Sequence, residues 1–176
     1  LSSTYWPMAW PSPEPVMLRV KTGKRSHLML PYRPAHSDDD AAPEFGPAEE
    51  AKPMPFRTVR QGARQRDITL DVAEKRLVQR DVVDEGHEHL IETDLEMYGD
   101  REDIFSIKES DPLSAMNICK RNLTLKRQDW IIRAETESTM SADETHFHVS
   151  NVLDAYEGDK RVFTKTWDIK IPRNLV

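Results

Sequence analysis

The sequence predicts an all-β fold: an antiparallel meander sheet that curls into a half-barrel or packs as a sandwich. From Phe56 onward, prolines nearly vanish and apolar residues alternate with polar ones at the two-residue period of a strand. Short turn-forming segments separate the alternating runs, and short loops join antiparallel neighbours. The sequence shows neither the apolar spacing of a long helix nor an internal repeat.

The predicted strands follow one another along residues 56–176. Shorter runs come first, at 66–72, 75–83, 87–95 and 103–108. Two segments that contain glycine and acidic residues are predicted as turns between them, at 84–86 and 97–100. Longer strands follow at 114–126, 129–140, 145–156 and 160–171, with turns at 127–128, 141–144 and 157–159.

The long strands each have one apolar and one polar face. Alternation puts Trp130, Ile132 and Ala134 on one side of their strand, and Arg133, Glu135 and Glu137 on the other. The last strand gathers its bulky apolar residues on one parity: Phe163, Trp167, Ile169 and Ile171. Such a one-sided sheet needs a cover, so we expect it to curl on itself or to pack on another layer.

The first 55 residues have a different composition, with ten of the 12 prolines of the chain. Short apolar runs at 16–20 and 26–30, separated by Gly23 and Lys24, predict a hairpin within residues 1–34. Residues 35–55 are acidic and proline-rich, as expected of an exposed linker. Residues 56–176 form the predicted antiparallel β domain.

Composition excludes several partners. The net charge is −6, and basic residues alternate with acidic ones, which disfavours binding to nucleic acid. The longest uncharged run, residues 1–13, contains three prolines and is too short to span a membrane. No basic segment precedes an apolar stretch, so we expect no signal peptide. A single cysteine, Cys119, permits no internal disulfide and favours a cytoplasmic location.

Motifs for catalysis are absent from the sequence. No pair of glycines brackets a serine as in a nucleophile elbow, and there is no phosphate-binding glycine loop, CxxC or HExxH. Cys119 lies inside a predicted strand, where a buried inert thiol is favoured over a nucleophile. We therefore predict no catalytic residue, no metal site and no cofactor.

Two His-x-His pairs are the strongest candidates for a site. His87 with His89, and His146 with His148, each put two imidazoles on one face of a strand. Metal sites use that geometry, but each pair supplies two ligands and structural zinc takes four. Histidines on a solvated strand face are the favoured interpretation, and an independent metalloenzyme is the weaker alternative.

An unusual aromatic segment opens the chain, with Tyr5, Trp6 and Trp10 among prolines. These residues form either a ligand platform or an anchor that packs against a neighbour. We favour the anchor and predict an interdomain or partner contact at these three side chains.

Several strings resemble the C-terminal region of the X-prolyl dipeptidyl-peptidase and cocaine-esterase-like (CocE/NonD) family of serine hydrolases. Residues 1–15 and 26–34 are similar to the end of that family's jelly-roll domain. The rest resembles a C-terminal extension found in a bacterial subset, through the strings at 111–115, 145–149, 155–158 and 167–176. The resemblance covers nearly the whole chain apart from the linker.

The resemblance implies a parent enzyme that hydrolyses X-Pro peptides, esters or amides through an acyl-enzyme. The family's Ser-Asp-His triad precedes the jelly roll, so no catalytic residue can be transferred to this chain. The first hypothesis is thus a non-catalytic β domain that supports an upstream catalytic domain or a homo-oligomer. The alternative is a β-barrel module that encloses a small apolar ligand. Bulky inward side chains that fill the interior favour the first hypothesis, and a cavity favours the second.

Overall fold

The computed structural model describes residues 10–14, 17, 19–24, 26–39 and 45–174. The chain divides into two compact units. Described residues 10–14 belong with residues 54–174 to the unit that contains the sheet, and residues 17–53 belong to the other unit. The domain boundaries near residues 34 and 55 stay predictions.

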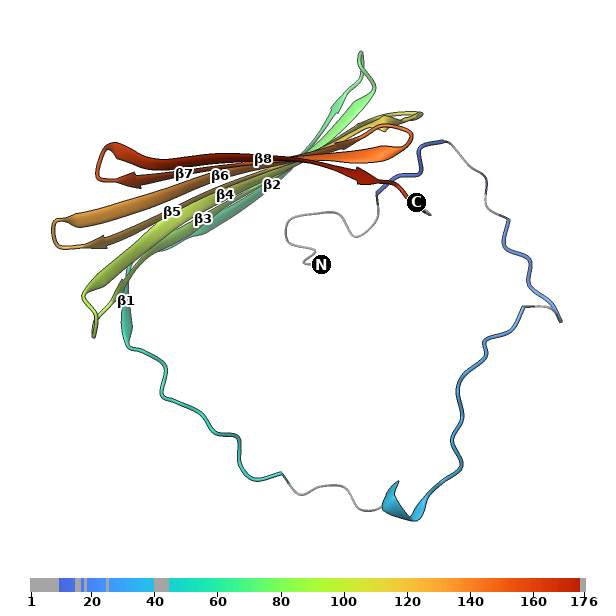
Figure 1. Cartoon of the computed structure of the whole chain (residues 1–176), viewed down its shortest axis with the longest axis horizontal. Coiled ribbons are helices and arrows are strands. Elements are labelled where there is room, and N and C mark those ends of the chain that lie inside the picture. The colour runs from blue at the N-terminus through green and yellow to red at the C-terminus, as the bar shows by residue number, and fades with distance from the viewer. Residues whose placement is uncertain (1–9, 15–16, 18, 25, 40–44, 175–176) are drawn as a thin grey trace. The chain divides into compact units, whose positions relative to one another are not determined.

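A single antiparallel sheet of eight strands makes up the larger unit, which confirms the predicted all-β meander (Figure 1). Neighbours in the sheet are neighbours in the chain from β3 onward, and each connection is a short turn. The strands are β1 (Phe56–Arg60), β2 (Ala63–Asp71), β3 (Arg76–Leu90), β4 (Leu95–Lys108), β5 (Asp111–Arg127), β6 (Trp130–Ala142), β7 (His146–Glu157) and β8 (Lys160–Pro172).

Two predicted turns are wrong, because they lie inside long strands. Residues 84–86 fall within β3 and residues 97–100 within β4. The ladder between these strands is interrupted only by a register shift between Asp84 and Gly86, where Gly86 pairs with Gly99. Here Gly86 lies at a β-bulge and Gly99 allows the neighbouring strand to approach closely, and neither glycine reverses the chain.

The first edge of the sheet is one strand broken in two. β1 and β2 both pair with β3, on either side of its bulge. Gly86 has a φ of +85°, and a Cβ there would lie 2.8 Å from the carbonyl oxygen of Arg60. The bulge therefore needs glycine, because an L side chain at this φ would be strained and would collide with the edge strand.

The predicted faces are confirmed by the strand register. Ala134 on β6, Ala155 on β7 and Phe163 on β8 lie in one cross-strand row. The apolar sets of β6 and β8 therefore share one side, which we call the inner face. The opposite side, the outer face, carries the charged residues of β6 and ion pairs such as Arg80–Glu102 at 2.5 Å.

The sheet curls toward its inner face. Trp10 contacts Phe147 on β7 and lines the same hollow as Leu77 on β3, although three strands separate β3 from β7. These two strands would be about 19 Å apart in a flat sheet. The ends do not meet, because β8 pairs only with β7, so the sheet is an open half-barrel.

Little of this sheet is buried. Among the described residues, the hydrophobic side chains that are buried are Ala115 and Cys119, both on β5. Bulky inner-face residues stay open to solvent, with Phe163 and Ile169 each 47% exposed. The structure thus describes one layer, and the apolar side of that layer is incompletely covered.

The smaller unit has little regular structure. Residues 26–30 form no strand, and Leu28 is 82% exposed, so the predicted hairpin does not form in the described part. A turn remains, in which the Ser26 amide donates to the Gly23 carbonyl at 2.8 Å. An isolated hairpin with no partner layer is marginal in water, which explains the difference. Val16 and Leu18 of that prediction lie outside the described residues.

Candidate packing surface on the inner face

A strip of paired charges crosses the middle of the inner face. Arg66 on β2 forms an ion pair with Asp81 on β3, and Arg121 on β5 donates to both carboxylate oxygens of Asp103 on β4, at 2.8 and 3.1 Å. The guanidinium group of Arg66 lowers the pKa of Asp81. Each carboxylate thus forms an ion pair with a guanidinium group from a neighbouring strand.

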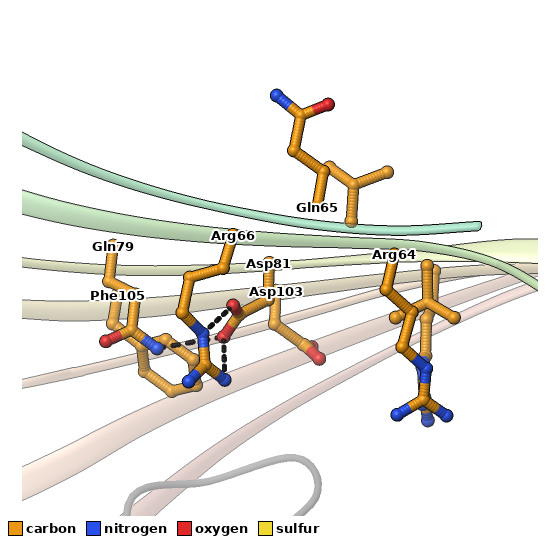
Figure 2. Close-up of a pocket in the computed structure, with 10 residues that line it drawn as sticks. Arg64, Gln65, Arg66, Gln79, Asp81, Asp103 and Phe105 are labelled. Atoms are coloured by element: carbon orange, nitrogen blue, oxygen red, sulfur yellow. Dashed lines mark hydrogen bonds and ion pairs between the residues drawn. The ribbon is translucent and has the colours of Figure 1, made fainter.

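These groups line an open hollow of about 540 Å³. Figure 2 shows Arg64, Arg66, Asp81 and Asp103 on one side of the sheet, with Gln65 on the opposite side, as strand alternation requires. Arg64 forms no ion pair with any described residue. A single unpaired arginine beside satisfied ion pairs gives this hollow a polar, slightly cationic floor.

Cys119 lies beside this strip, in the same cross-strand row as Asp103. The side chain is 2% exposed, and its Sγ lies 3.6 Å from Oδ1 of Asn117. Burial, together with the Asp103 carboxylate, raises the pKa of the thiol to about 12. The thiolate needed for nucleophilic attack is thus suppressed at neutral pH.

An apolar region lies at one end of the inner face, where Trp10 and Pro11 sit. The Trp10 ring meets the Phe147 ring edge-on, with centroids 6.1 Å apart. Arg173, which is 8% exposed, stacks over Phe147 and donates from Nη2 to the Pro11 carbonyl oxygen at 2.5 Å. Beside this contact is a hollow of about 210 Å³, lined by Leu77, Phe105, Ile107 and Ala115 among others.

A second apolar region lies at the other end, toward the turns that follow β5 and β7. Its hollow of about 460 Å³ is lined by Leu123, Leu125, Trp130, Ile132 and Val162 among others. Trp130 is 41% exposed and Leu123 46% exposed. The inner face therefore has two apolar ends joined by a polar centre.

The histidine pairs lie at opposite ends of the sheet and do not form one ligand set. His87 pairs with Glu96 at 2.7 Å and His89 with Asp94 at 2.9 Å, beside the β3–β4 turn. His148 pairs with Asp143 at 2.8 Å, beside the β6–β7 turn. Among the described residues, no group of three or more His, Cys, Asp or Glu side chains is arranged to hold a metal ion.

The predicted contact residues are described only in part. Tyr5 and Trp6 lie outside the described residues, and Trp10 packs on the sheet of its own chain. A contact of these residues with another domain or protein stays a prediction.

The paired charges of the strip and the Arg173 contact were not identified from the sequence. One signal was available, because Asp81 shares its strand parity with Leu77 and Val83, and Asp103 shares its parity with Phe105 and Ile107.

No protein-family model, no curated protein and no solved structure matches this chain. Within the described part of the chain, no helix has the length and apolar character needed to cross a membrane.

Proposed function

We propose that this chain is a non-catalytic β domain that packs its inner face against the rest of a larger protein. The parent we propose is a cytoplasmic bacterial serine hydrolase of the X-prolyl dipeptidyl-peptidase and cocaine-esterase-like type, in which this region supports the catalytic domain or an oligomer. The resemblance described above supports that parent.

One observation carries the proposal of a packing role. Strand alternation assigns Phe163 and Ile169 to the side of the sheet meant for burial, yet each is 47% exposed. A bulky apolar face without a second layer is typical of a surface that another protein segment covers. The alternative, a ligand-binding barrel, has less support because the sheet is open between β1 and β8.

The test compares three proteins. The first is the product of the gene with its upstream sequence, the second is the same product ending before Phe56, and the third is the present chain alone. We expect ester or X-Pro hydrolysis in the first two, with lower stability in the truncated protein. We expect no turnover above background from the chain alone. Turnover that remains with the isolated chain through repurification would show that the domain is catalytic.

A further inference from the structure

We propose that the partner surface which covers the inner face presents carboxylate groups to Arg64 on β2 and to Lys165 on β8, and apolar side chains to the two apolar ends of that face. The inference rests on the packing role proposed above and adds the chemistry of the partner. It commits to an acidic protein surface as the occupant, in place of a second copy of this chain.

The first observation is that Arg64 and Lys165 lie in one cross-strand row of the inner face. Strand pairing carries this row from Arg64 through Arg101 and Arg121 to Lys165. The strands that hold its two ends, β2 and β8, lie at opposite edges of the sheet (Figure 1). A partner that covers the inner face therefore meets a cation at each end of the same row.

The second observation is that the arginines in the middle of the row have acidic partners, whereas Arg64 has none. Arg101 pairs with Glu85 at 3.2 Å, and Arg121 pairs with Asp103 at 2.8 Å. No carboxylate among the described residues pairs with Arg64, which lies on the same side of the sheet as Asp103 (Figure 2). The positive charge of Arg64 is therefore balanced only by solvent.

Lys165 is the second cation of the row without an acidic partner in the described part of the chain. Its Nζ lies 4.8 Å from the centroid of the Trp167 ring, which is on the same parity of β8. The ammonium group is thus held over the inner face. A contact with a ring face leaves the charge in place, so a carboxylate can still bind the ammonium group.

Covering the inner face would take Arg64 and Lys165 out of water. A charge that is buried without an opposite charge is strongly unfavourable, so the cover must supply anionic groups at these two points. In a protein partner these groups are carboxylates, and the planar guanidinium group of Arg64 can bind one through two parallel hydrogen bonds. Apolar side chains on either side of the carboxylates would match the apolar hollows at the two ends of the face.

The same row argues against a second copy as the occupant. Two copies related by a twofold axis contribute the same surface to their contact. If two inner faces stack with their rows aligned, a cation at the end of one row meets a cation at the end of the other. Like charges in contact oppose association, and an acidic partner avoids this repulsion.

The test measures binding of the chain to the separately produced upstream part of its gene product, with charge reversals on both faces. Arg64→Glu and Lys165→Glu change the inner face, while Arg57→Glu and Lys170→Glu make the same changes on the outer face. All four side chains are exposed, so none of the variants should disturb folding. At low ionic strength we expect Kd to rise about tenfold or more in the inner-face variants and less than about twofold in the outer-face variants. Added salt should reduce the difference, because it screens exposed charges.

Ile169→Lys separates a failure of this inference from a failure of the packing role. Binding that is lost in Ile169→Lys but unchanged in Arg64→Glu and Lys165→Glu would overturn the acidic partner and leave the packing role standing. No binding by the wild-type chain would overturn both. Self-association of the chain alone, if Ile169→Lys abolished it, would assign the inner face to a second copy and would also overturn this inference.

Discussion

At the scale of single residues, the inner face combines polar groups that are satisfied with apolar groups that are not covered. Asn117 is fully buried and Asp103 is 8% exposed, while Phe163, on an edge strand, is about half exposed. Hydrophobic side chains normally fill the interior and polar ones the surface. The reversed distribution follows from a single-layer sheet, in which the centre is shielded by neighbouring side chains and the edges are not.

Cys119 provides the first test at this scale. Because burial raises the pKa of its thiol to about 12, we expect no modification by a thiol reagent at pH 8 in the native chain. Modification should be complete in concentrated urea, where burial is lost. If the native thiol were modified as fast as the unfolded one, Cys119 would lie in an accessible position and the assigned centre of the sheet would be incorrect.

Asp84 provides a pH test. The Arg60 guanidinium and the Gly86 amide hold the pKa of Asp84 near 2, below its ordinary value of 3.8. A carboxylate whose pKa is lowered by folding contributes stability above its unfolded pKa and loses it as the pH falls through the folded pKa.

We therefore expect Asp84→Asn to lower the free energy of unfolding at pH 6, and the difference from wild type to shrink toward zero between pH 4 and pH 2. Urea denaturation at several pH values measures this difference in the free energy of unfolding. Asp159→Asn, in the exposed β7–β8 turn, serves as the control and should change little. A deficit in Asp84→Asn that stays constant down to pH 2 would exclude the Arg60 ion pair as its source.

At the scale of elements, alternation predicted β2 and β5–β8 closely, because each has a clear two-residue period and is bounded by a short turn. The β3–β4 hairpin was predicted as three short strands separated by two turns, since Gly86 and Gly99 occur beside acidic residues in patterns typical of turns. Sequence alone does not distinguish a glycine that reverses the chain from one that admits a neighbouring strand. The polar strip was missed because its ion pairs, Arg66 with Asp81 and Arg121 with Asp103, join neighbouring strands, and the pattern of one strand does not give its register with the next.

The bulge itself makes the next prediction. Gly86→Ala should lower the free energy of unfolding by about 1–3 kcal/mol, because it places a side chain at a strained φ and against the Arg60 carbonyl. Gly46→Ala is the matched control, since a Cβ there meets nothing within 4 Å. Equal stability of the two variants in urea denaturation would show that the edge strand moves away without penalty.

At the scale of the whole molecule, an open half-barrel with a thin core has the features of a domain completed by its surroundings. The sequence predicted the need for a cover from the one-sided strands, and it predicted a sheet that curls into a half-barrel or packs as a sandwich without deciding between the two. Closure depends on how strongly the sheet coils and on which side chains its edge strands carry. The edge strand β8 carries Lys165 on its inner-face parity, with Nζ of Lys165 4.8 Å from the centroid of the Trp167 ring. A charge at such a position disfavours pairing of an edge strand with a further strand.

The most direct test of a packing role for the inner face is an association measurement between this chain and the separately produced upstream part of its gene product. Ile169→Lys puts a charge on the inner face of β8, and Thr166→Lys puts the same charge on the outer face of the same strand. We predict that the wild-type chain and Thr166→Lys bind with similar affinity, and that Ile169→Lys loses binding. Binding that Ile169→Lys leaves intact and Thr166→Lys abolishes, or no association at all, would contradict the account.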